Sequence, residues 1–366
     1  MKAESAARQR FVVLDTMRGY AACVVMTLHY GYLKTTNAYM AVDFFFLLSG
    51  FVLAHAYFNR PDINFWSFAQ YRLARLYPLH LLTFLLTAVL LTVIGREWYD
   101  GEFILHLFML HNIGLGPDRV AFNSPAWSIS VEFWVNLAIG LLAVLVIAVR
   151  ASKLVRNVVL GGIAAVCYLV LAASHGHVNL YYQDLMPLVN LGLLRGLGSI
   201  CVGVLLYDVF RALSAPRSDM GHFWLQILTP VALGLFLVIM VLLPNETPWD
   251  FVALVVMMGI VIIMAFEVGP IAVLARKFDF LGRISFSIYL VHVPIQWALK
   301  EAIGDRFSFF TGYLIQFAVV IAVSYLTYTY FEKPSYAWGK RALRDAGNWC
   351  KKTVRGRQKS QAPPFS

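Results

Sequence analysis

The stretch LDTMRGYAACVVMTLHY, residues 14–30, is apolar almost throughout, yet it carries Asp15 and Arg18 near one end and His29 near the other. A run of about 20 predominantly apolar residues is the length that an α-helix needs to cross the hydrocarbon core of a membrane. Ionisable side chains at membrane depth are costly, so they usually face a cavity or a partner. This stretch therefore predicts a membrane-spanning helix that carries functional side chains.

The rest of the chain repeats this apolar pattern. Hydrophobic residues make up 60% of its 366 residues and charged residues 14%, against roughly 25% charged in a typical soluble domain. The long apolar blocks predict an all-α fold, a polytopic membrane helix bundle of about ten transmembrane helices. The expected spans are residues 14–33, 41–58, 77–95, 127–149, 157–173, 188–208, 223–243, 249–266, 284–301 and 310–331. The segment 102–116 is too short for a span and is expected to be a re-entrant or interfacial segment packed inside the protein.

The distribution of Lys and Arg predicts the orientation. Most of the 30 basic residues fall in the two tails and in alternate loops, which places both termini in the cytoplasm. The net charge of +10 is explained by this bias and by contact with anionic membrane lipids, and no nucleic acid partner is predicted. Residues 1–338 are expected to form one membrane domain, followed by a basic cytoplasmic tail, 339–366.

Two residues near the outer face are the first catalytic candidates. His29 lies near the outer end of the first span, and Asp43 lies just inside the second span, which returns from the same face. Because the connecting loop is short, the two helices form a hairpin in which both side chains reach similar depth. A carboxylate beside an imidazole fixes its tautomer and raises its basicity, as a general base requires.

Further polar side chains fall in the middle-to-outer half of the membrane. Glu132 lies in SPAWSISVEFW and His292 in SIYLVHVP. Each taken alone is also typical of a satisfied hydrogen bond between helices. We expect no metal site, because His106 and His111 lack a carboxylate partner at the spacing of metal ligands.

Arginines gather at the predicted cytoplasmic boundary. Arg18 lies eleven residues before His29, which is roughly 16 Å along a helix and about three turns, so both side chains share one helix face. Arg72 and Arg75 lie in the QYRLARLYPLH loop, with Arg283 at the base of the ninth span. Guanidinium groups converging at a membrane boundary suit a phosphorylated ligand. The positive-inside rule alone is the other interpretation for Arg75 or Arg283 taken singly.

Six elements in a fixed order resemble a known family. They are LDTMRG followed by His29, VDFFFLLSGFVLA, RLARLYP, SPAWSISVE, LGRISFSIYLVHVPI and FEKPSYAW, within residues 11–338. Together they resemble the acyltransferase family 3 proteins, bacterial inner-membrane enzymes that O-acylate surface polysaccharides. The chain ends soon after the last span, without the extracytoplasmic SGNH-type domain of some relatives, so we expect the membrane domain to complete the transfer.

The resemblance implies roles for the candidates. Arg72, Arg75, Arg18 and Ser49 are expected to bind acetyl-coenzyme A, and the acceptor is a glycan or lipid-linked saccharide. His29, oriented by Asp43, would deprotonate the acceptor hydroxyl or would first carry the acetyl group itself. The expected acceptor-binding or oxyanion-stabilising residues are Glu132, Trp127 and His292.

Two other interpretations were weighed. A transporter or flippase of a glycolipid or an anionic solute would also need buried charge at mid-membrane, but no internal repeat is found in the sequence. A non-catalytic scaffold does not account for Arg18, His29 and Asp43. The acceptor sugar and the length of the acyl group are not determined by the sequence, and a second copy of the chain, as a homo-oligomer, is a further candidate partner.

Overall fold

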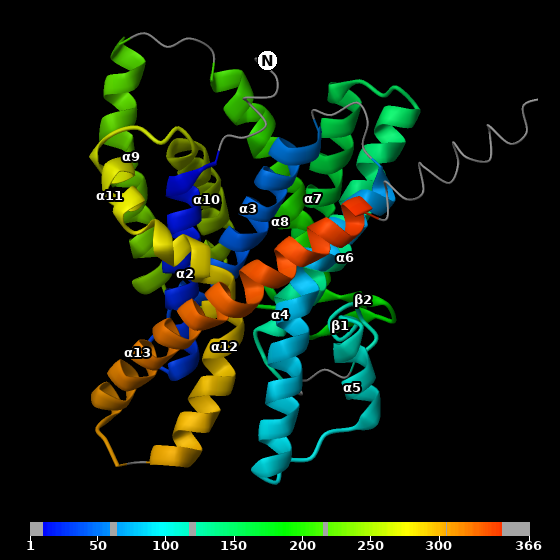
Figure 1. Cartoon of the computed structure of the whole chain (residues 1–366). Coiled ribbons are helices and arrows are strands. Elements are labelled where there is room, and N and C mark those ends of the chain that lie inside the picture. The colour runs from blue at the N-terminus through cyan, green and yellow to red at the C-terminus, as the bar shows by residue number, and fades with distance from the viewer. Residues whose placement is uncertain (1–9, 59–63, 117–121, 215–218, 305, 346–366) are drawn as a thin grey trace, which may run out of the picture.

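The computed structural model describes residues 10–58, 64–116, 122–214, 219–304 and 306–345. In chain order the elements are α2 (Val12–Tyr30), η1 (Asn37–Met40), α3 (Ala41–Leu53), η2 (Ala54–Phe58), α4 (Phe65–Val93), α5 (Asp100–Leu107), α6 (Ala126–Ala148), α7 (Lys153–His175), β1 (Asp184–Met186), β2 (Val189–Asn190), α8 (Leu191–Leu213), α9 (Asp219–Val241), α10 (Trp249–Ala265), α11 (Pro270–Lys277), α12 (Asp279–Ile303), α13 (Phe309–Thr327) and η3 (Tyr328–Glu332). Figure 1 shows them as a bundle of helices with a small hairpin, β1–β2, at its side.

A helix occupies every predicted span. Seven of the described helices are long and apolar enough to cross a membrane, and the pair α10–α11, bent by 85°, would make an eighth. The other two predicted spans coincide with α2 and α12, each of which carries charged residues and a histidine. The all-α membrane bundle is therefore confirmed, and the antiparallel hairpin β1–β2 is a small addition that the sequence did not predict.

The start of α4 corrects one prediction. The third span was expected to begin at residue 77, after an arginine loop, but α4 begins at Phe65 and continues through Pro78. The side chain of Asn64 accepts a hydrogen bond from the backbone N–H of Ser67 and so caps the helix. Arg72 and Arg75 are therefore held on a regular helix rather than in a loop.

The structure describes the segment 102–116 in full but only the first part of the predicted tail. Helix α5 has eight residues, and the Glu102 and His106 side chains on it are buried, as expected for a segment that packs inside the protein. The last helix continues from α13 through η3 to Asp345. The remainder of the predicted tail, 346–366, lies outside the described residues.

Glycines allow two pairs of helices to approach closely. In α2 and α12, a Cβ on Gly19 would lie 2.6 Å from the backbone of Leu281, and one on Gly282 would lie 2.5 Å from the carbonyl oxygen of Asp15. In α3 and α8, a Cβ on Gly50 would overlap the carbonyl of Ile200 in the same way. Small residues that let backbones meet are typical of helix packing in membranes. Helices α2, α3, α8 and α12, which meet at these two crossings, carry many of the side chains of the candidate active site described below.

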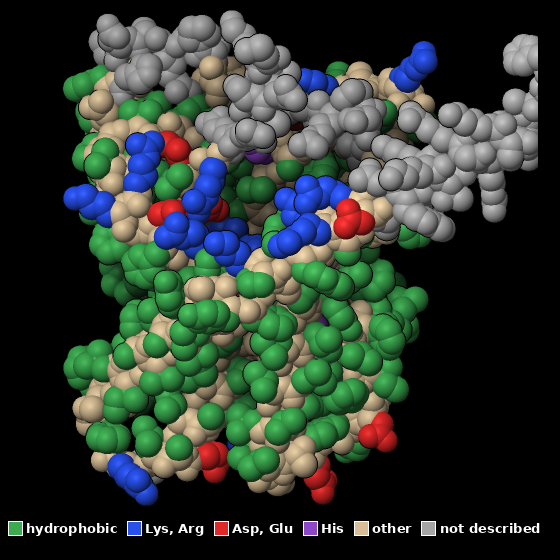
Figure 2. Space-filling model, viewed as in Figure 1, with side chains coloured by type: hydrophobic (Ala, Val, Ile, Leu, Met, Phe, Trp, Pro, Cys, Tyr) green, Lys and Arg blue, Asp and Glu red, His purple; other side chains and the backbone are tan. Residues whose placement is uncertain are grey.

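The surface agrees with a membrane setting. Figure 2 shows Lys and Arg side chains gathered in the upper part of this face, above a broad apolar surface that ends at a few charged residues at the lower tip. Large apolar side chains are exposed on several helices, among them Leu86, Val93 and Val255. Soluble monomers rarely expose continuous apolar surface on this scale. The chain is a multi-pass membrane protein.

Candidate active site

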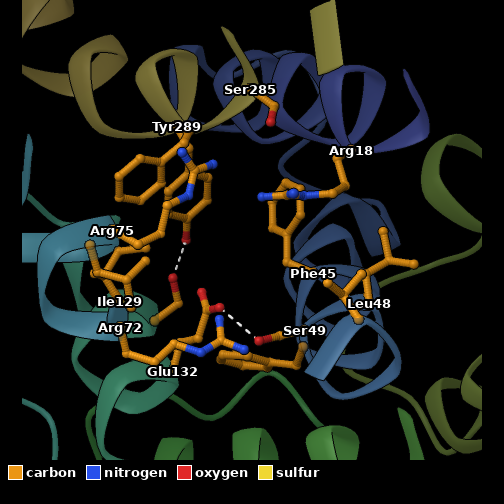
Figure 3. Close-up of a pocket in the computed structure, with 15 residues that line it drawn as sticks. Arg18, Phe45, Leu48, Ser49, Arg72, Arg75, Ile129, Glu132, Ser285 and Tyr289 are labelled. Atoms are coloured by element: carbon orange, nitrogen blue, oxygen red, sulfur yellow. Dashed lines mark hydrogen bonds between the residues drawn. The ribbon is translucent and has the colours of Figure 1, made fainter. Parts of the chain in front are cut away.

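Five helices surround a cavity rich in arginine, which we call the arginine cavity. It has a volume of about 160 Å³ and is lined from α2, α3, α4, α6 and α12. All four side chains predicted to bind the acyl donor line it: Arg18, Ser49, Arg72 and Arg75. Figure 3 shows their polar ends turned toward the central space. The structure thus brings together residues that are far apart in the sequence.

The arginines of this cavity are unequally neutralised. Arg75 donates to Glu332 at 2.9 Å, whereas Arg18 lies 3.8 Å from the carboxylate of Asp15. Within the described part of the chain, the Nε of Arg72 is buried and has no hydrogen-bond partner. A buried N–H group without an acceptor is costly. An anionic ligand that supplied an oxygen here would remove that cost.

Glu132 lines the arginine cavity, whereas the sequence analysis grouped it with the expected acceptor-binding residues. Its Oε1 accepts a hydrogen bond of 2.7 Å from Ser49 Oγ, and the amide of Asn136 lies within 3.5 Å of the same oxygen. Glu132 was expected to act with Trp127, which lines a different cavity. The reason is helical rise, because five residues displace a side chain by roughly 7.5 Å along α6.

The second cavity, which we call the histidine cavity, is larger, with a volume of about 520 Å³. His29 and Trp127 line it, as do Tyr181 and Tyr182 from the loop between α7 and the hairpin. Aromatic faces and scattered amides at a concave site suit a polar ligand with apolar patches. The chemistry of this cavity differs from that of the arginine cavity, which carries the guanidinium groups of α4.

His29 pairs with His292. The Nε2 of His292 lies 3.2 Å from Nδ1 of His29, and each Nδ1 lies close to a carbonyl of its own helix, Val25 O at 2.9 Å and Ile288 O at 3.0 Å. Since carbonyl oxygens only accept, we assign the proton of both neutral rings to Nδ1. His292 Nε2 is then an acceptor for His29 Nδ1–H, and His29 Nε2 keeps its lone pair. That nitrogen is the one that can take a proton.

The predicted pairing of His29 with Asp43 is wrong. Asp43 is buried and bound by Arg195 through Nε at 3.0 Å and Nη2 at 2.5 Å, and Ser199 Oγ lies 3.4 Å away. Similar depth does not bring two side chains together. The Asp43 side chain lies on the face of α3 that packs against α8, where it meets Arg195. A buried carboxylate needs such a partner.

Arg195 is the residue that the sequence argument missed. It is among the largest fully buried side chains, and its guanidinium lies 5.6 Å from the ring centroids of both Tyr39 and Trp127. It lines the histidine cavity, so the ion pair with Asp43 supports one wall of that cavity. An arginine inside an apolar span was the available signal, because such a charge requires a partner.

Tyr289 separates the two cavities. Among the side chains that line the arginine cavity and the histidine cavity, it is the only one that lines both within the described residues. Its hydroxyl oxygen lies 2.7 Å from Ser128 Oγ, a hydrogen bond that Figure 3 marks with a dashed line. The two cavities therefore meet at Tyr289, whose hydroxyl is hydrogen-bonded to Ser128.

A multi-pass helix bundle with an arginine-lined cavity next to a cavity that contains a histidine has the features of a membrane enzyme. Residues 11–329 match the family model described as an acyltransferase domain. The chain belongs to this acyltransferase family and is an enzyme that transfers acyl groups. The family predicted from the six sequence elements is confirmed, and the family gives no support to the transporter alternative.

Several curated proteins are similar to the chain. "Acyltransferase MdmB" of Streptomyces mycarofaciens is 39% identical over 106 residues, which is 27% of either chain. "Putative membrane-bound transacylase BcsY" of Komagataeibacter xylinus is 24% identical over 361 residues, covering 92% of this chain and 85% of that protein. "Putative peptidoglycan O-acetyltransferase YrhL" of Bacillus subtilis is 30% identical over 135 residues, 32% of this chain and 21% of that protein. No solved structure matches.

Proposed function

We propose that the enzyme transfers an acetyl group from acetyl-coenzyme A to a hydroxyl of a surface polysaccharide or of its lipid-linked precursor. The observation that carries this proposal is the contact of the arginine cavity with the histidine cavity at Tyr289. One cavity suits the phosphates of a donor, and the other suits a neutral, hydroxyl-rich acceptor beside a base. The name of the relative YrhL supports a polysaccharide acceptor.

The donor would enter from the cytoplasm, where the bias of basic residues places the arginine cavity. Arg18, Arg72 and Arg75 would bind phosphate oxygens of coenzyme A at the mouth, with the buried Nε of Arg72 as one donor that awaits an acceptor. The pantetheine arm would then direct the thioester past Ser49 toward Tyr289. The fit rests on the charge of the lining and on this unpartnered N–H.

The acceptor would occupy the histidine cavity. His29 Nε2 would take the proton of the sugar hydroxyl as its oxygen attacks the thioester carbon, the carbon–sulfur bond would break, and the coenzyme A thiolate would receive the proton. In an alternative order of steps, His29 Nε2 first attacks the thioester carbon and displaces the coenzyme A thiolate. The sugar oxygen then takes the acetyl group from His29, and the hydroxyl proton passes to the thiolate. Both orders use the same nitrogen. In this proposal the enzyme lies in the bacterial inner membrane, with its acceptor on the outer side.

The test uses the full-length protein purified in detergent, labelled acetyl-coenzyme A and a panel of bacterial polysaccharides. Wild type should label at least one polysaccharide, and His29→Ala should lower the rate by at least about 100-fold, the contribution of a positioned general base. His175→Ala, on the exposed end of α7, is the matched control and should retain the wild-type rate. Equal labelling by wild type and His29→Ala would refute the role of His29. No labelling of any glycan by wild type would refute the acceptor class.

A further inference from the structure

Tyr289 occupies the one position where a donor in the arginine cavity meets an acceptor in the histidine cavity. It lies on α12, one helical turn before His292, so the two side chains share a helix face. The Tyr289 and His292 ring centroids are 6.2 Å apart, and the Tyr289 ring packs edge-on against Phe45 at 5.4 Å. These contacts hold the Tyr289 ring where the two cavities meet.

The direction of the hydrogen bond between Tyr289 and Ser128 follows from counting protons. Each hydroxyl has one proton to donate. Ser128 Oγ also lies 3.2 Å from the carbonyl oxygen of Pro125, which can only accept, so we assign the Ser128 proton to that contact. Tyr289 is then the donor in the 2.7 Å contact with Ser128 Oγ. The free enzyme thus holds a buried O–H donor at the junction of its two cavities.

Acyl transfer creates a demand for such a donor. When the sugar oxygen attacks, the thioester carbonyl oxygen gains negative charge, and a preorganised donor at that point lowers the barrier. His29 is occupied as the base, and the arginines are assigned to the phosphates. Tyr289 is the remaining donor at the junction among the described residues that line both cavities.

We propose that Tyr289 is a catalytic residue, whose hydroxyl donates to the carbonyl oxygen of the acyl thioester as the acceptor attacks. In the free enzyme Ser128 accepts this hydrogen bond, and the incoming thioester oxygen replaces it. The tyrosine proton stays on Tyr289 throughout, while the acceptor proton passes to His29 and then to the thiolate. This assignment rests on the proposed acyl transfer from coenzyme A.

The experiment compares Tyr289→Phe with Ser128→Ala. The first variant removes the donor and keeps the ring, whereas the second removes the resting acceptor and keeps the donor. Two rates are measured. One is acetyl transfer to the polysaccharide, and the other is hydrolysis of acetyl-coenzyme A, measured as release of free coenzyme A when no polysaccharide is present. The affinity for acetyl-coenzyme A is measured separately, and thermal unfolding in detergent confirms that each variant is folded. Tyr325→Phe, exposed on α13, is the matched tyrosine control.

Tyr289→Phe should lower kcat of both reactions by about 100-fold, the loss seen when an oxyanion donor is removed, with the affinity for acetyl-coenzyme A changed by less than about threefold. Ser128→Ala should lower kcat by less than about tenfold.

Equal losses in the two variants would show that only the Ser128–Tyr289 contact matters and would overturn the assignment. So would a full rate in Tyr289→Phe. Release of coenzyme A by wild type without transfer to any glycan would refute the proposed acceptor while still testing Tyr289. If the wild-type enzyme catalysed neither reaction, both the proposed function and the role of Tyr289 would be overturned.

Discussion

Nδ1 of His29 and Nε2 of His292 lie 3.2 Å apart, although the two residues are separated by most of the chain. The pair connects α2 to α12 and leaves Nε2 of His29 as the nitrogen that can accept a proton. The proposed base, His29, is therefore in contact with a second histidine rather than with a carboxylate.

The first prediction concerns His292 as the positioning residue. His292→Gln places an amide oxygen near the position of Nε2, whereas the shorter His292→Asn does not reach it. We expect the asparagine variant to lower kcat by about 100-fold and the glutamine variant to recover at least tenfold of that loss, with KM for acetyl-coenzyme A unchanged in both. Steady-state kinetics with varied donor would check this. Equal rates in the two variants would show that His292 has only a packing role.

Asp43 and Arg195 should behave as a structural pair. Removing either partner leaves a buried charge, which costs about 3–5 kcal/mol of stability. Asp43→Ala and Arg195→Ala should each lower Tm in detergent, and the double variant should lose less than the two single losses added. Strict additivity in this double-mutant cycle would contradict the pairing. A Tm of the wild-type value with lost activity would assign Asp43 to the chemistry.

Arg72 and Arg75 should act on donor binding. Each Arg→Ala change should raise KM for acetyl-coenzyme A by about 10- to 100-fold, since a hydrogen bond to a charged group contributes about 1.5–3 kcal/mol. Acetyl-3′-dephospho-coenzyme A separates the contacts, because an arginine that binds the 3′-phosphate has no effect when that group is absent. Arg211→Ala, outside the cavity, is the control. A KM that neither arginine changes would contradict phosphate binding in this cavity.

Gly50 tests the crossing of α3 and α8. A methyl group there meets the backbone carbonyl of Ile200, which cannot rotate away, so Gly50→Ala should destabilise the protein by about 1–3 kcal/mol. Gly234→Ala on α9 meets no described atom within 4 Å, so it should not lower Tm. Thermal unfolding of the two variants in detergent checks the prediction. An unchanged Tm in Gly50→Ala would show that the helices separate at no cost.

Much of the architecture could be predicted because membrane helices follow a single constraint. A polypeptide in lipid must satisfy its own backbone hydrogen bonds, so long apolar blocks become helices wherever they occur. The predicted third span began at residue 77, where the apolar block starts. Helix α4 starts earlier, at Phe65, because a helix can extend beyond its apolar block and Asn64 caps it there. The hairpin β1–β2 pairs a strand of three residues with one of two, which is too short for an alternating pattern to predict it.

The site was predicted less completely, because the sequence does not determine the rotation of each helix about its own axis. Apolar blocks determine depth, so Arg18 and His29 were correctly placed on one helix, and the arginines that line the arginine cavity were correctly grouped. Depth does not determine which neighbour a side chain faces. Asp43 was therefore given the wrong partner, Arg195 was given none, and Glu132 was grouped with Trp127 although the two line different cavities. Tyr289 lacks a charge and gave no signal of its own.

The glycine crossing of α2 and α12 has a geometric consequence. The two helices run in the same direction, and His29 lies as many residues beyond Gly19 as His292 lies beyond Gly282. Each imidazole is thus at the end of an arm of roughly 15 Å that starts at a shared pivot. A change of about 5° in the crossing angle would displace one arm's end relative to the other by roughly 1.3 Å at that helical rise, enough to break a 3.2 Å contact. Arg18 is adjacent to the pivot, so the helix that brings it to the arginine cavity also determines the distance between His29 and His292.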